Sequence, residues 1–235
     1  MVNANNADQV YTTGDDTKIF YDDDLMVSNE SDYDCADMQN DGQPDKTYYF
    51  NGVQTLFHHV MSRINVKFIQ SSKDLNDDEI SLPSGQTINI IVKKVAFDGI
   101  YTTASYSANP GGIEAWHDFK DQTDGAVIYS DETFGTSLNT TEAKTVVSGY
   151  FAIPQDMVAN QQKITVTYDI VSTIDGYQYR EKNFTESAYL TKAGVDWTVN
   201  KDITYTITLS PIRMPILFTA TAEDWTDGAS INLTD

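Results

Sequence analysis

The sequence predicts an all-β protein, and three segments of its C-terminal third carry the prediction. In residues 164–170, 203–209 and 216–222 an apolar side chain alternates with threonine or another small or polar residue. This period of two is typical of a strand with one buried face, and no segment shows a convincing 3.6-residue period. We expect antiparallel strands of one sheet or sandwich, whose core residues are Ile164, Val166, Tyr168, Ile203, Tyr205, Ile207 and Leu209.

Strands are also predicted elsewhere in the chain. The segment 56–68 is apolar and ends in clean alternation over 64–68, and 88–97 and 101–107 follow, joined by Asp98-Gly99 in what resembles a hairpin turn. A short strand is expected at 18–21 within an acidic, loop-rich N-terminal region. In the second half, strand patterns occur at 146–153, 164–171, 177–184, 203–209 and 216–222.

The strongest break in the pattern is Asn109-Pro-Gly-Gly112. The polar segment that follows it, 113–145, is expected to be irregular. A length of 235 residues suits either one large sandwich or two smaller domains. We place a boundary near residue 112, which gives an N-terminal domain of residues 1–112 and a C-terminal domain of residues 113–235.

Charge and composition exclude several kinds of partner. The chain carries 35 acidic and 15 basic residues, a formal charge of −20, so it repels nucleic acid phosphates and anionic membrane surfaces. No apolar stretch is long enough to span a membrane, and the first residues do not resemble a signal peptide. Cys35 is the only cysteine, which excludes an intramolecular disulfide.

The sequence contains no recognisable active site, so we expect no catalytic residues, no cofactor and no enzymatic activity. It has no glycine-rich phosphate loop, nucleophile elbow or zinc motif. His58 and His59 are adjacent on an expected strand, so they point to opposite faces and do not chelate one ion together. One of them is expected to face the core and to bond a backbone carbonyl. A glycosidase acting through paired carboxylates finds no separable acid and base pair here.

No metal is expected either. The only metal-like spacing is that of Asp37, Asp41, Gly42 and Asp45, which match four positions of a calcium loop. Position 12 of that loop is Tyr48, where a bidentate acid is needed, so a solvated turn is the preferred interpretation. Trp116, Trp197 and Trp225 are assigned to core or sheet-edge packing, with sugar stacking as the alternative.

Several segments, taken in order, resemble the fimbrillin family of the Bacteroidetes. Asp24-Leu-Met-Val27 precedes Phe57-His-His-Val-Met-Ser-Arg-Ile-Asn-Val-Lys-Phe68, in which His59, Ser62 and Arg63 match the family strand motif. The strand 90–97 and the Tyr101–Tyr106 hairpin follow, then Ile153-Pro-Gln155 before 164–168. Trp197 and the strand 201–209 precede the segment that ends at Trp225.

This resemblance implies two transthyretin-like antiparallel β-sandwich domains and a non-enzymatic cell-surface protein. The implied function is that of a fimbrial tip or accessory subunit that joins other subunits by donor-strand pairing. The alternative is a monomeric surface lipoprotein that binds a carbohydrate or a host ligand. The implied location is extracellular, on a fimbria or anchored to the outer membrane.

The two ends of the chain bear on its position in a fimbria. The region before Asp24 is shorter than the family's usual start, and only ten residues follow Trp225, whereas a stalk subunit is expected to carry a longer C-terminal extension. We therefore expect a tip, accessory or lipid-anchored relative. Lys18 and Lys46 are the only basic residues before the strand that contains Arg63.

Overall fold

The computed structural model describes residues 9–12, 26–28, 57–74, 76–107, 115–212 and 215–225, of which 9–12, 26–28 and 57–58 are described as backbone only. The regular secondary structure of the described part is almost all strand, as predicted. Its one helical element is a single 3₁₀ turn, η1 (Leu190–Ala193). The all-β prediction is confirmed.

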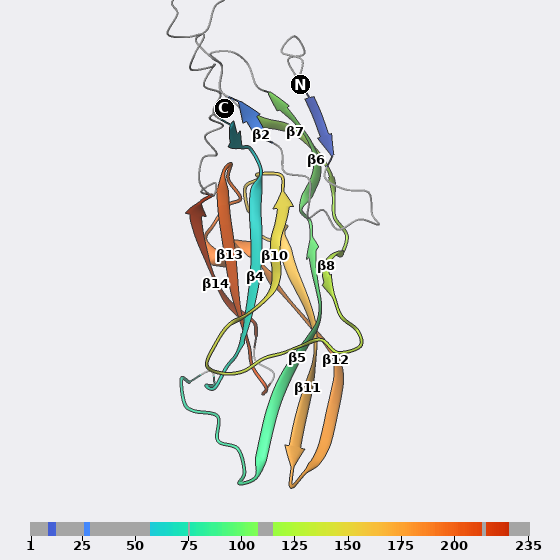
Figure 1. The fold of residues 1–235 in the computed structure, drawn as a ribbon, viewed down its shortest axis with the longest axis vertical. Helices are drawn as coiled ribbons and strands as arrows, with labels where there is room; N and C mark the ends of the chain where they lie inside the picture. Colours follow the sequence, from blue (N-terminus) through green and yellow to red (C-terminus); the bar gives the residue numbers. More distant parts are fainter. Residues whose placement is uncertain are drawn as a thin grey trace, which may run out of the picture.

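Two sheets packed face to face form the body of the molecule, which is elongated along the strands (Figure 1). The four-stranded sheet has the order β10 (Lys144–Ala152), β4 (Ser62–Gln70), β13 (Lys201–Leu209), β14 (Leu217–Asp224). The five-stranded sheet has the order β12 (Tyr177–Tyr189), β11 (Lys163–Ile174), β5 (Gln86–Asp98), β8 (Ala126–Ser130), and β9 (Thr136–Ser137) also pairs with β5.

Two smaller sheets lie at the upper end of the view in Figure 1. One joins β1 (Gln9–Thr12), β6 (Tyr101–Ser107) and β7 (Ala115–Gln122), and the other pairs β2 (Met26–Ser28) with β3 (Phe57–His59). At the lower end β5, β11 and β12 extend past the four-stranded sheet (Figure 1), and the side chains of Tyr177 and Tyr179 on this extension are largely exposed.

The alternating residues named above form the core between the two large sheets. Each of the seven predicted core side chains is at most 1% exposed, so the predicted inward face is confirmed. Both sheets contribute to one cluster, in which Phe68 and Phe97 meet Tyr150, Tyr168 and Trp197. Burial of side chains of this size stabilises the fold by about 1.5 to 3 kcal/mol each.

The pairing of β4 differs from the antiparallel expectation. It runs antiparallel to β10 but parallel to β13, in a register that pairs Ser62 with Lys201 and Gln70 with Leu209. A parallel neighbour cannot be reached through a tight turn. The 130 residues between Gln70 and Lys201 include all five strands of the opposite sheet, and this long excursion makes the parallel pair possible.

Strands that precede residue 112 in the sequence pair within the same sheets with strands that follow it. β4 pairs with β10 and β13, and β5 pairs with β11, so the boundary predicted at residue 112 does not separate the two sheets. Most of residues 1–56, including the strand expected at 18–21, lies outside the described residues. The division of the chain into two domains, residues 1–112 and 113–235, stays a prediction.

Two local predictions were wrong. Asp98-Gly99 is not a hairpin turn, because β5 pairs within the five-stranded sheet and β6 within the three-stranded one. Gly99 (φ +71°) instead turns the chain beside Gln161, whose carbonyl oxygen would lie 2.8 Å from an added Cβ. The segment 113–145 is not irregular throughout, since it holds β7, β8 and β9. No residue of β7 is fully buried, and positive φ at Asp118 and Asp121 interrupts the strand, so it shows no apolar alternation.

Candidate functional site

Strand β4 is the most distinctive element of the sandwich, because it lies inside a sheet to which no hairpin connects it. Its side chains alternate strictly between buried and half-buried, with Ile64, Val66 and Phe68 fully buried against the opposite sheet. β10 and β13 bond its two edges, and both are distant in sequence. The rest of the sandwich thus forms a slot that β4 fills. We call this the β4 slot, the space between β10 and β13.

Polar side chains fix both ends of β4. At its start the Ser62 hydroxyl, which is fully buried, donates to the carbonyl oxygen of Thr198 at 2.8 Å. At its end the Gln70 amide spans to β5, donating from Nε2 to Ile88 O at 2.9 Å and accepting from Ile90 N–H at 3.0 Å. Because each of these bonds requires one particular position along the strand, they set the register of β4 in the slot.

The strand motif that contains His59 and Arg63 contacts Trp225, the last residue of the C-terminal motif. The His59 ring, which is buried, stacks on the Trp225 ring at 3.5 Å with a 3° interplanar angle. The guanidinium carbon of Arg63 lies 4.9 Å from the Trp225 ring centroid, and Arg63 Nε donates to Asp202 Oδ2 at 3.1 Å. Phe151 completes the group, 5.3 Å from Trp225. Stacking and cation–π contact therefore tie β3, β4 and β10 to the residue that follows β14, and the Arg63–Asp202 ion pair adds β13.

The histidine and tryptophan predictions are partly confirmed. His59 is buried, as expected for one of the adjacent pair, while the expected bond to a backbone carbonyl stays a prediction. Trp197 is a core residue whose indole N–H donates to the Tyr205 hydroxyl at 2.8 Å. Trp116 and Trp225 are half-buried, so the three tryptophans do not form one exposed set.

The model of the fimbrillin-like family matches residues 3–225, nearly the whole length of the chain. The chain belongs to the fimbrillin-like family. The resemblance drawn from the motifs is thereby confirmed. No curated protein is significantly similar to the chain in sequence.

Solved structures resemble this fimbrillin-like chain to different degrees. A proposed cell adhesion protein from Bacteroides uniformis matches 95% of it with a TM-score of 0.52 and 16% identity, and the match covers 68% of that protein. A fimbrial protein from Bacteroides vulgatus matches 78% of it with a TM-score of 0.41 and 19% identity, covering 60% of that protein. At such identities the first likeness shows the fold alone, and this chain spans about two thirds of either structure or less.

His117 of the fimbrillin-like chain lies in a row of hydrogen-bonding groups on β6 and β7. Its Nε2 is 2.7 Å from the Ser107 hydroxyl oxygen and its Nδ1 is 3.0 Å from Asp118 Oδ2. Serine hydrolases use the same order of groups, but they bury the carboxylate, whereas the Asp118 side chain is 66% exposed. The row therefore lacks the buried carboxylate of that arrangement, and we assign the Ser107–His117 bond to holding β6 and β7 together.

The calcium-like residues Asp37, Asp41 and Asp45 lie outside the described residues. Within the described residues, no group of three or more His, Cys, Asp or Glu side chains is placed to hold a metal ion. Over the same part of the chain, no helix has the length and apolar character needed to cross a membrane.

Sequence reasoning missed Gln70, Asp202 and the parallel pairing of β4. Gln70 and Asp202 look like ordinary polar residues at the ends of strands, and nothing in the local pattern names their distant partners. The exception is the order of the family motifs, since the Ser62-Arg63 motif and the Trp225 segment prove to be spatial neighbours.

Proposed function

We propose that this chain is a non-enzymatic cell-surface protein, a structural or adhesive subunit of a fimbria, that assembles with other subunits by strand complementation. Membership of the fimbrillin-like family supports the surface and fimbrial role. The observation that carries the mechanism is β4, a central strand with strict alternation that no hairpin joins to its neighbours. A strand from another subunit with the same alternation could occupy the same slot.

An incoming strand with the right sequence can replace β4 without a net loss of interactions. A strand in the β4 slot makes backbone hydrogen bonds to β10 on one side and to β13 on the other. It also buries three large apolar side chains, which contribute about 1.5 to 3 kcal/mol each. An incoming strand regains all of these interactions only if its apolar residues fall at the positions of Ile64, Val66 and Phe68, so alternation provides specificity.

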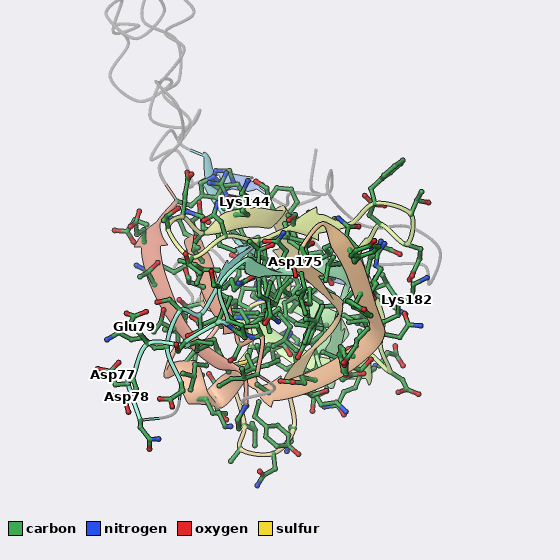
Figure 2. All side chains as sticks on the ribbon, turned by 90° about the horizontal axis from the view of Figure 1, so that it is seen from below. Asp77, Asp78, Glu79, Lys144, Asp175 and Lys182 are labelled. Atoms are coloured by element: carbon green, nitrogen blue, oxygen red, sulfur yellow. The ribbon has the colours of Figure 1, made fainter. Side chains whose placement is uncertain are left out.

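The loop between β4 and β5 is a suitable place to cut the chain and test this mechanism directly. It spans residues 71–85 and is largely exposed, and Figure 2 shows Asp77, Asp78 and Glu79 pointing outward on it. A site-specific protease sequence inserted between Asp77 and Asp78 allows β4 to be cut from β5 with the sandwich in place, since exposed loop tips tolerate insertion. We expect a labelled peptide of residues 57–73 to enter the cut protein and displace the fragment that carries β4.

Two controls accompany the peptide test. The uncut protein should not take up the peptide, and neither should the cut protein take up a peptide with Val66→Asp, because that charge would be buried without a partner. Equal uptake of both peptides, or none of the native peptide after partial unfolding and refolding of the cut protein, contradicts strand complementation.

The position in the fimbria follows as a separate prediction. We propose a tip or accessory placement, and we expect the purified chain of residues 1–235 to be monomeric and not to polymerise, with or without trypsin. Arg63 is protected because its strand is bonded on both edges. Size-exclusion chromatography and denaturing gels check this. Ladders of SDS-resistant oligomers after proteolysis would instead indicate a stalk subunit.

A further inference from the structure

A cavity of about 690 Å³ opens between the β6–β7 hairpin and the sandwich. One wall is aromatic, from Tyr101, Trp116 and Phe119, and the other comes from the segments that follow β10 and precede β13. Its volume lies within the range of 300 to 1,000 Å³ typical of small-molecule sites. It adjoins the start of β4, where Ser62 bonds the Thr198 carbonyl oxygen, but no side chain of β4 lines it.

The aromatic wall is held rigidly. The Trp116 indole N–H donates to the Val60 carbonyl oxygen at 2.7 Å, which fixes the orientation of the ring. Phe119 packs against Tyr101 with 5.4 Å between ring centroids. The buried Gln155 amide anchors the Tyr101 backbone, accepting from its N–H at 2.9 Å and donating to its carbonyl at 3.2 Å. A wall fixed in this way loses little entropy when a ligand binds.

Polar groups also line the cavity. Asp156 and Thr198 are exposed on the two facing segments, and Lys201 reaches the same cavity from the start of β13, its ammonium paired with the Asp224 carboxylate. The lining therefore combines flat aromatic faces with hydrogen-bonding groups, and Pro154, Val158 and Val199 add further apolar surface. An apolar peptide side chain would match the aromatic wall but would remove water from Asp156 without replacing its hydrogen bonds.

We propose that this cavity binds a neutral sugar ring of a glycan. A pyranose presents C–H groups on its face, which pack on aromatic rings, and hydroxyls around its edge, which suit Asp156, Thr198 and Lys201. The net charge of −20 disfavours sulfated or sialylated glycans. The inference goes beyond fimbrial assembly, since it assigns this subunit its own ligand.

The test is binding of the whole chain to an array of immobilised glycans that end in galactose, N-acetylglucosamine or mannose, with sialylated and sulfated glycans alongside. We expect binding to at least one neutral group and weaker binding to the anionic ones. Trp116→Ala should lower the affinity at least tenfold. Val199→Arg, which places a long side chain at the rim from a position that is 37% exposed, should do the same without touching the core.

Tyr177→Ala is the matched control, because it removes an aromatic ring that is 75% exposed at the start of β12, outside the residues that line the cavity. Its glycan binding should equal that of the native chain. No binding to any neutral glycan, a preference for anionic glycans, or equal binding by Val199→Arg and the native chain would overturn the proposal. Peptide uptake into the β4 slot should be unchanged in Val199→Arg, so the two proposals fail independently.

Discussion

Replacing Tyr205 by alanine should lower the free energy of unfolding by about 3 to 5 kcal/mol, the range for truncating a large buried side chain. Tyr205 is fully buried on β13, and its ring packs near Phe218 in the core. Its hydroxyl also accepts the Trp197 indole N–H at 2.8 Å. The alanine variant therefore leaves both a cavity and an unsatisfied buried donor.

Chemical denaturation measures this loss, and two variants separate its parts. Burial raises the pKa of the Tyr205 phenol, so it stays neutral at pH 7. Tyr205→Phe keeps the ring and removes only the acceptor, at a cost of about 1 to 3 kcal/mol for the stranded indole N–H. Tyr177→Ala, at an exposed position, should change stability by no more than about 0.5 kcal/mol. A loss below about 1 kcal/mol for Tyr205→Ala would mean that the inward face of β13 is wrongly assigned.

Gly135→Ala is expected to cost about 2 to 5 kcal/mol. Gly135 has φ +68°, where a residue with a Cβ pays about 1 to 2 kcal/mol. An added Cβ would also lie 2.6 Å from both Ile91 Cγ2 and the Val92 carbonyl oxygen. Because part of this contact is with backbone, relief requires β9 to move away from β5, and overpacking of this kind costs about 1 to 3 kcal/mol more.

Gly176→Ala is the matched control for this substitution. Gly176 has φ +82° in the turn between β11 and β12, but an added Cβ there meets nothing within 4 Å. It should show the backbone cost alone, about 1 to 2 kcal/mol. Equal losses for the two variants in urea denaturation would contradict the close packing of residue 135 against β5.

The buried faces of the strands could be predicted from sequence because alternation is a local signal. Val166 and Ile207, for example, are separated by one residue from their nearest buried neighbours along the strand, and a single strand's pattern is enough to turn them inward. The partner of each strand could not be predicted in this way. Nothing within residues 62–70 indicates that β13 lies beside it, since that pairing closes a loop of more than a hundred residues.

The same difference between local and long-range signals applies to the candidate sites. The strand motif containing His59 and Arg63 and the residue Trp225 could be named from the sequence, and the structure places them in contact. The aromatic cavity could not be predicted, because Tyr101 and Trp116 line it only after β6 and β7 fold back beside the segments around residues 156 and 198. Side chains from three separate parts of the chain make that site, and no local spacing connects them.

The most direct test of strand complementation asks whether an incoming strand occupies the β4 slot in register. Thr206 on β13 pairs with Lys67 on β4, and Thr208 pairs with Ile69. The cut protein carries Thr206→Cys and Cys35→Ser, and the labelled peptide carries Lys67→Cys. Adjacent strands lie about 4.8 Å apart, within the separation that a disulfide spans, whereas a shift of two residues places the Cα atoms about 8 Å apart, beyond it. We predict efficient disulfide trapping at position 206 and little at Thr208→Cys. Equal trapping at both positions, or at neither, would contradict the assignment of the β4 slot as the site of assembly.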